Sequence, residues 1–225
     1  MINRCFGHIF IFCFIFSFLL KECFTQDAHS NLISILEANY PVEFTFQQKY
    51  QNQTLDGWMV IYGNGMARTE FAPPNNNLII ANGKWIVFHD PAIDRTTYIP
   101  LDKGILNALL NPKSLRKDKV FQVNEEQKNS KTIFTLEFNI NNKNQKIILN
   151  FDEKSKNLLG WRLYESTKDF IDVKIMVMKE FSLSDNYNLK DFFKIDDSNS
   201  DNRKLYFGPY KNRKVKKYLG TGKLN

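Results

Sequence analysis

The sequence predicts a mainly β (α+β) protein in which one antiparallel sheet curls into a barrel or half-barrel that helices close. Three observations lead to this fold class. About ten or eleven stretches alternate apolar with polar residues, as expected for strands that bury one face. Turns rich in Gly, Asn and Pro separate these stretches, and only two segments show helical spacing. A chain of 225 residues, 43% of them hydrophobic, can also build one sizeable core.

The first segment, residues 1–28, is predicted to be a signal peptide. Arg4 precedes an apolar run over residues 9–20. As a helix this run would span about 18 Å, against about 30 Å of bilayer hydrocarbon, so it is too short to cross a membrane. An uncleaved interfacial anchor is the alternative. All three cysteines lie in this segment, so the exported domain is expected to have no disulfide, thiol nucleophile or thiolate metal site.

The first half of the domain begins with a helix and continues with strands. Apolar residues at helical spacing predict a short helix over residues 31–39, which Tyr40-Pro41 ends. Gly63-Asn64-Gly65 and Asn82-Gly83 predict hairpin turns, because Gly and Asn tolerate positive φ. The strands expected here are 42–49, 55–62, 66–71, 78–81, 84–89 and 95–99.

The second half also begins with a short helix and continues with strands. A short helix over 105–110 is closed by Asn111-Pro112. The strands expected after it are 120–123, 132–138, 146–151, 159–164 and 173–183. Short turns between so many strands imply a mostly antiparallel sheet with one apolar and one mixed face. A single sheet of this length must curl to bury its apolar face.

Charge separates a neutral body from a basic tail. The formal net charge is +7, but eight of the 31 basic residues and only one of the 24 acidic residues lie in residues 198–225. We therefore expect one neutral domain over 29–197, which does not favour nucleic acid as a partner, and a flexible tail. Basic residues mixed with aromatic ones suit an anionic membrane surface or an acidic patch of a partner, and a solvated extension is the alternative. The candidate contacts in the tail are Lys211, Arg213, Lys214, Lys216 and Lys217.

No catalytic constellation stands out in the expected mature domain. His89-Asp90 is a neighbouring His–acid pair, but adjacent strand residues face opposite sides of a sheet, which makes a poor dyad. Asp152-Glu153 lies in a predicted turn. The sequence contains no G-x-S-x-G, no P-loop and no H-x-x-x-H motif. We therefore expect no enzyme activity, no bound metal and no cofactor.

Several motifs resemble those of the outer-membrane lipoprotein carrier family (LolA type). Phe46-Gln47-Gln48 and Gly57-Trp58-Met59-Val60 are similar to its two opening strands. The block 78–91 resembles its most characteristic stretch, which consists of an apolar strand, an Asp-Gly-Lys-like turn, an aromatic-rich strand and a final Asp-Pro or Asn-Pro. Thr96-Thr97-Tyr98 and Leu109-Leu110-Asn111-Pro112 stand where the family has its next strand and short helix. The similarity runs from about residue 33 to residue 193.

The resemblance implies a periplasmic monomer with an incomplete antiparallel β-barrel, whose helices form a lid over an apolar cavity. The cavity would shield the acyl chains of lipoproteins, taken from an inner-membrane ABC transporter and given to an outer-membrane acceptor. A lipid- or lipoprotein-sensing regulatory domain on the same fold is the alternative. The residues that we expect to line the concave face, each with an ordinary core position as its alternative, are Val42, Phe44, Phe46, Met59, Ile61, Phe71, Ile147, Leu149, Phe151, Val173, Ile175 and Val177.

The sequence also departs from the family pattern. Gly63-Asn64-Gly65 stands where the family usually has Arg-Pro-Gly, whose Arg helps to latch the lid. Arg68 is the candidate substitute, although its side chain is expected on the opposite face of the sheet. Ala67 and Thr69 replace bulkier residues, which would widen the cavity. His89 replaces the usual Tyr.

Overall fold

The computed structural model describes residues 27–102, 104–116, 121–140, 143–164, 169–183, 188–194 and 208–209. Its strands are β1 (Val42–Tyr50), β2 (Gln53–Gly63), β3 (Met66–Phe71), β4 (Leu78–Asn82), β5 (Trp85–Asp90), β6 (Arg95–Pro100), β7 (Phe121–Lys128), β8 (Lys131–Ile140), β9 (Lys143–Asp152), β10 (Leu158–Tyr164) and β11 (Phe170–Glu180). Its helices are α2 (Ala28–Asn39), α3 (Ile105–Leu110), the 3₁₀ helix η1 (Pro112–Arg116) and α4 (Leu189–Phe192). The predicted mainly β class is confirmed.

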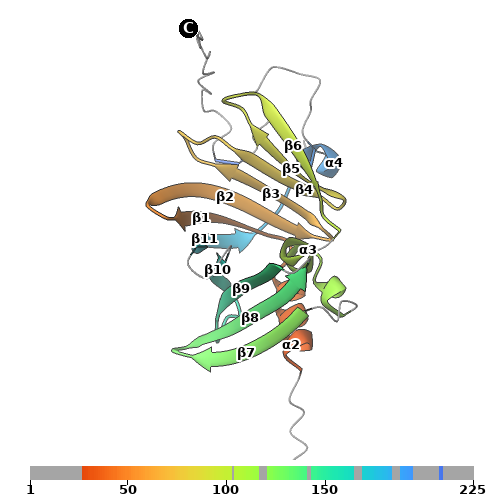
Figure 1. The fold of residues 1–225 in the computed structure, drawn as a ribbon, viewed down its shortest axis with the longest axis vertical. Helices are drawn as coiled ribbons and strands as arrows, with labels where there is room; N and C mark the ends of the chain where they lie inside the picture. Colours follow the sequence, from red (N-terminus) through yellow and green to blue (C-terminus); the bar gives the residue numbers. More distant parts are fainter. Residues whose placement is uncertain are drawn as a thin grey trace, which may run out of the picture.

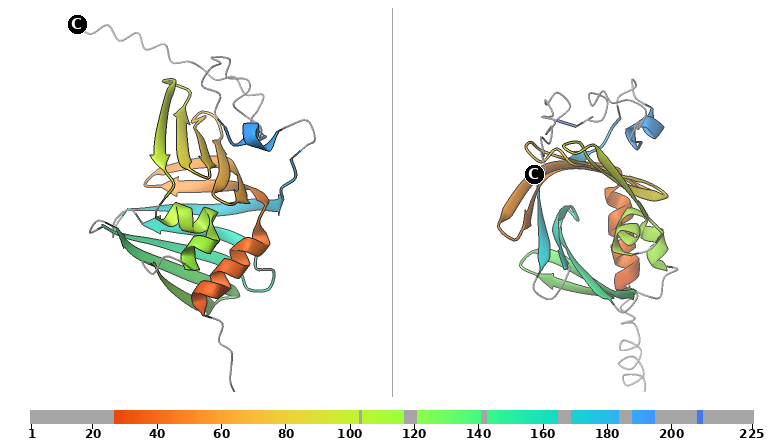
Figure 2. Two further views of the ribbon diagram at one scale, coloured as in Figure 1. Left: turned by 90° about the vertical axis from the view of Figure 1, so that its right-hand side faces the viewer. Right: turned by 45° about the horizontal axis from the view of Figure 1, so that its top comes forward.

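The eleven strands form one antiparallel sheet in the order β6-β5-β4-β3-β2-β1-β11-β10-β9-β8-β7 (Figure 1). Neighbours in sequence pair from β1 to β6 and from β7 to β11, and the two runs meet where β1 pairs with β11. Because β6 and β7 stand at opposite ends of this order, the described strands form an incomplete barrel. The sheet curls around α2 and α3 (Figure 2), which defines a concave face toward these helices and a convex face away from them.

Helix α2 is longer than predicted, because it begins at Ala28 and not at Asn31. Its first turn has no apolar spacing that sequence analysis could detect. It ends at Asn39, since Pro41 restricts the residue before it and has no N–H to donate. The Asn39 side chain donates hydrogen bonds to the carbonyls of Ile35 (2.8 Å) and Lys156 (3.0 Å), so the end of the helix is tied to the β9–β10 turn.

Both faces of the sheet carry a buried apolar cluster. On the concave face, α2, α3 and η1 pack against β8, β9 and β10, and a second group on the same face gathers around β1, β2 and β3. On the convex face, α4 and the end of β11 cover β2, β4 and β5 with the cluster Trp58, Val60, Leu78, Ile80, Val87, Phe181, Phe192 and Phe193. Strand β3 is therefore buried on both faces, whereas the sequence predicted one apolar and one mixed face.

Candidate functional site

Strand β1 forms the centre of the concave face. Val42, Phe44 and Phe46 are buried, and the residues between them are less so, which is the alternation predicted from the sequence. The Phe44 ring meets those of Phe46 and Trp161 edge-on, with centroid distances of 6.4 Å and 6.1 Å. Phe46 lies over Gly57 of β2, where a Cβ would overlap its ring. Glycine at this position lets an aromatic side chain lie flat on the neighbouring strand.

The concave face brings together the predicted lining residues from five strands, with one exception. One group packs around β1 and the other against the helices. The first group contains Val42, Phe44, Phe46, Met59, Ile61, Phe71, Val173 and Ile175. The second contains Ile147, Leu149 and Phe151, and Ile175 also packs against it. That these residues contact lipid remains a prediction, because each of them also serves the core of the closed domain.

The exception is Val177, and its predicted place on the concave face is wrong. The register of β1 and β11 shifts between Thr45, which pairs with Val177, and Phe46, which pairs with Ile175. This bulge inserts one extra residue into β11 and reverses the alternation beyond it. Met178 then packs on the concave face, whereas Val177 is 63% exposed. The alternating sequence of β11 carries no signal of the bulge.

Helices α2, α3 and η1 cover the β7–β10 half of the concave face (Figure 2). Leu32, Ile33 and Leu36 of α2 are almost fully buried there, together with Phe134 and Leu149 from the sheet. The side chains that pack in this contact are mainly apolar on both sides. Among the described residues, the hydroxyls of Ser114 in η1 and Thr132 in β8 are buried without a hydrogen-bond partner.

Two hydrogen bonds tie the end of α3 to the rest of the barrel. The Tyr40 hydroxyl donates to the Leu109 carbonyl (2.9 Å), and the Gly65 N–H donates to the Leu110 carbonyl (2.8 Å). Burial raises the pKa of Tyr40, so its hydroxyl stays protonated and remains a donor across the physiological range. Gly65 belongs to the Gly63-Asn64-Gly65 hairpin between β2 and β3. Sequence analysis missed Tyr40, because its partner is a backbone carbonyl 69 residues away.

Arg68 does not latch these helices, and that prediction is wrong. Its side chain is fully buried on the convex face, where it donates to Glu70 Oε1 (2.8 Å) and to the Phe192 carbonyl of α4 (2.8 Å). The alternation of β3 places Arg68 opposite Ala67 and Thr69, as the sequence indicates, and α4 then covers it.

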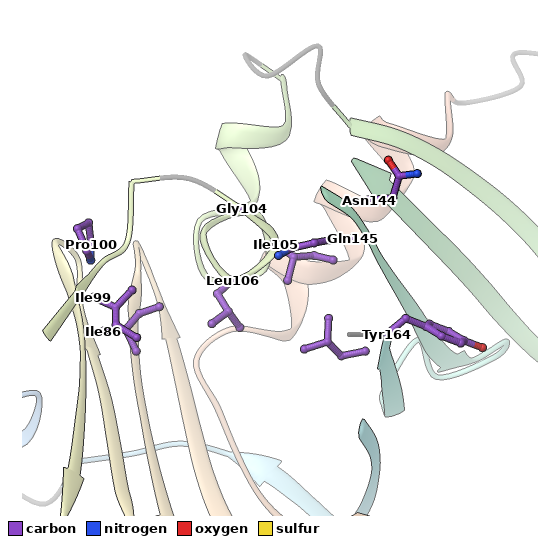
Figure 3. Close-up of a pocket in the computed structure, with 10 residues that line it drawn as sticks. Ile86, Ile99, Pro100, Gly104, Ile105, Leu106, Asn144, Gln145 and Tyr164 are labelled. Atoms are coloured by element: carbon purple, nitrogen blue, oxygen red, sulfur yellow. The ribbon is translucent and has the colours of Figure 1, made fainter. Parts of the chain in front are cut away.

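A pocket of about 700 Å³ opens between the two halves of the sheet (Figure 3). It lies where α3 meets the concave side of β5 and β6 and the ends of β9 and β10. Its lining residues are Ile86, Ile99, Pro100, Gly104, Ile105, Leu106, Asn144, Gln145, Leu163 and Tyr164. This volume lies in the range of small-molecule binding pockets. Such pockets are typically lined by apolar side chains and a few polar groups, as this one is. Alternation in β5 and β10 could have identified Ile86 and Leu163 as concave residues.

The remaining polar candidates support no catalytic site. The His89 Nδ1 lies 2.9 Å from Thr96 Oγ1 on the convex side, whereas Asp90 accepts a hydrogen bond from the Ala92 N–H in the following turn. Among the residues that the structure describes, no group of three or more His, Cys, Asp or Glu side chains could hold a metal ion. None of the described helices combines the length and apolar character that crossing a bilayer requires. The predicted signal peptide and the tail residues Lys211–Lys217 lie outside the described residues, apart from Asp27 and Ala28.

Comparison with known proteins agrees with this architecture. The chain matches the family described as outer membrane lipoprotein carrier protein LolA over residues 34–196, which include all eleven strands. The outer-membrane lipoprotein carrier proteins of Legionella pneumophila strains Lens and Corby are 30% and 29% identical to it over 169 residues, covering 70% of this chain and 82% of each relative.

Two solved structures align with much of this chain, at low sequence identity and with TM-scores below 0.5. One is a LolA superfamily protein from Nitrosomonas europaea, with 12% identity, a TM-score of 0.38, and coverage of 72% of this chain and 96% of that one. Another is the MucA/MucB complex of Pseudomonas aeruginosa, with 12% identity, a TM-score of 0.42, and coverage of 68% and 56%. The family match over most of the chain is the decisive finding, and the protein belongs to the LolA family of outer-membrane lipoprotein carriers.

Proposed function

We propose that this protein is a periplasmic carrier that shields the acyl chains of lipoproteins between its sheet and its helices. It would take them from an inner-membrane ABC transporter and give them to an outer-membrane acceptor, as a binding protein and not as an enzyme. The observation that carries this proposal is the pocket between α3, β6 and β10, because its lining residues Ile86, Ile105 and Leu163 also pack in the apolar clusters of the concave face. Family membership supports the same reading.

The buried helices give such a carrier a means of release. Burial of an acyl chain is favourable by about 0.8 kcal/mol per methylene, so a fully buried long chain would be held by more than about 10 kcal/mol. A carrier must oppose this affinity if it is to pass its cargo on. Here the contacts of Leu32, Ile33 and Leu36 with the sheet form only when the lid is closed. Their loss on opening would offset part of the free energy of cargo binding.

Ile99 tests the pocket directly. It is 50% exposed and lines the pocket, so Ile99→Asp places a charge at the entrance with little effect on folding. We expect about tenfold weaker binding of a fluorescent fatty-acid probe, because the charge would have to lose water when a chain enters. Tyr98→Asp is the matched control, since Tyr98 is 48% exposed on the same strand but faces the convex side. Equal binding by both variants would contradict the assignment of the pocket.

Tyr40 tests the lid. Tyr40→Phe removes the hydrogen bond to the partly buried Leu109 carbonyl, which should weaken the closed state by about 1 kcal/mol. Because the open state binds cargo, we expect about fivefold tighter probe binding and a lower midpoint of thermal unfolding. Tyr98→Phe should leave probe binding unchanged, because Tyr98 faces the convex side. Weaker probe binding by Tyr40→Phe would indicate that Tyr40 belongs to the binding surface and not to the lid.

Transfer between membranes tests the carrier role itself. Purified mature protein should move a labelled lipoprotein from donor to acceptor vesicles, and Ile99→Asp should slow this transfer. Binding of the probe without transfer would favour the lipid-sensing alternative. If the protein neither bound the probe nor transferred the lipoprotein, the proposal would be overturned.

A further inference from the structure

Gly208 contacts the convex face at β2 and β3, although it is far from these strands in sequence. The Gly208 N–H donates to both carboxylate oxygens of Glu70, at 3.3 Å and 3.1 Å. Gly208 is buried, and a Cβ at this position would overlap the indole ring of Trp58. Only glycine brings its backbone this close to Trp58, so residue 208 is held by shape as well as by hydrogen bonding.

The site that receives Gly208 is a buried polar cluster. Arg68 and Glu70 form an ion pair in which neither side chain is exposed to solvent. Arg68 also donates to the Phe192 carbonyl, and its guanidinium lies 5.3 Å from the centre of the Phe192 ring. Trp58 in turn donates from Nε1 to Glu43 Oε2 (3.0 Å). A buried carboxylate requires hydrogen-bond donors, and Arg68 and Gly208 supply them together.

This contact determines where the basic tail leaves the domain. Residues 210–225 follow directly and contain no acid and six bases, Lys211, Arg213, Lys214, Lys216, Lys217 and Lys223. The first three lie within six residues of Gly208, hence within roughly 21 Å of it even in a fully extended chain. Lys190 and Lys194 are exposed on or just after α4, with Asp191 between them, so this segment adds a net charge of only +1 on the same side.

The convex face and the pocket point in opposite directions. On β5, Ile86 lines the pocket, whereas its neighbour Val87 packs into the convex cluster with Trp58. On β6, Ile99 lines the pocket, and Tyr98 pairs with Val87 on the other side. Figure 2 shows the same arrangement, with α4 outside the sheet and α2 and α3 inside it.

We propose that Trp58 and Glu70 form an anchor site for Gly208, and that the anchored tail attaches the convex side of the protein to an anionic lipid surface. The charge of the tail supplies the attraction, as expected for a cluster of bases beside acidic headgroups. The anchor supplies the orientation, because a tail fixed at Gly208 draws the convex side toward the membrane and leaves the pocket facing away. The proposal does not depend on the identity of the cargo.

Vesicle binding tests the attraction. The mature chain should co-sediment with phosphatidylcholine vesicles that contain phosphatidylglycerol at least tenfold better than with pure phosphatidylcholine, and salt should weaken this binding. Removal of residues 210–225, which keeps Gly208 in the chain, should abolish the preference for vesicles that contain phosphatidylglycerol. Equal binding of the full and shortened chains, or no preference for phosphatidylglycerol, would overturn the membrane assignment; the latter would leave an acidic protein partner to be tested.

Paired labels test the orientation. Because the expected mature domain has no cysteine, Tyr98→Cys and Ile99→Cys allow a fluorophore on opposite sides of the same strand. Quencher-bearing anionic vesicles should quench the label at 98 more than the label at 99. Gly208→Ala should keep the binding but remove this difference. Stronger quenching of the label at 99 would overturn the proposed anchor site. So would a difference in quenching between the two labels that persists in Gly208→Ala.

Hydrogen exchange at the Gly208 amide tests the anchor directly. The Gly208 amide of the full mature chain should exchange slowly, as expected for a buried N–H bound to a carboxylate. Exchange at the rate of a free peptide would overturn the anchor site even if the tail binds vesicles. Glu70→Gln, which keeps the shape of the side chain, should accelerate exchange at Gly208.

Discussion

Leu36→Ala is expected to destabilise the closed domain by about 2–5 kcal/mol and yet to raise its affinity for an acyl-chain probe. Leu36 is 2% exposed on α2 and packs in the cluster that holds the lid on β8 and β9. Truncation of the Leu36 side chain would leave a cavity in the closed state. In the open state Leu36 makes no contact with the sheet, so the truncation would cost less there. The substitution therefore shifts the population toward the open form, and about 1.4 kcal/mol of this shift corresponds to tenfold tighter binding.

The experiment combines two measurements on each variant. Urea unfolding gives the loss of stability, and titration with a fluorescent fatty acid gives the affinity. Leu159→Ala is the matched control, because Leu159 is 36% exposed and lies outside the buried lid cluster. It should change both quantities little. If affinity falls together with stability in Leu36→Ala, the helices belong to the binding surface, and the lid mechanism is wrong.

The fold could be predicted from the sequence because its strands follow a simple rule. Alternation along β1 and β9 correctly placed Phe44, Phe46 and Leu149 on the concave face. Hairpins with Asn and Gly marked where the strands turn, as Asn64 and Gly83 show by their positive φ. Each of these features depends on neighbours in sequence, so no distant contact was needed to recognise it.

The parts of the site that could not be predicted depend on distant contacts. The bulge that exposes Val177 arises where β11 pairs with β1, and neither strand shows it alone. The lid bond of Tyr40 ends on a backbone carbonyl, which has no sequence signature. Arg68 was correctly expected on the face opposite the cavity, but nothing local indicated that α4 and Gly208 would cover it.

Arg68→Met is expected to cost about 3–5 kcal/mol of the free energy of unfolding, because it removes the guanidinium that pairs with the buried Glu70 carboxylate. The loss should come mainly from the weaker compensation of this buried charge and less from the missing attraction within the ion pair. The double variant Arg68→Met/Glu70→Leu should therefore recover much of the stability of the native protein. Urea unfolding of the two single variants and the double variant gives the coupling energy between the residues.

Arg162 provides the control for this cycle. It makes a bidentate ion pair with Asp172, but both side chains are more than a third exposed. Water stabilises the Asp172 carboxylate when its partner is removed, so Arg162→Met should cost less than about 1 kcal/mol. A similar loss in both arginine variants would contradict the role of burial. If the double variant is less stable than Arg68→Met, Glu70 stabilises the convex face through Gly208 even without Arg68. The hydrogen bonds between Gly208 and Glu70 would then contribute more to the free energy of unfolding than the ion pair does.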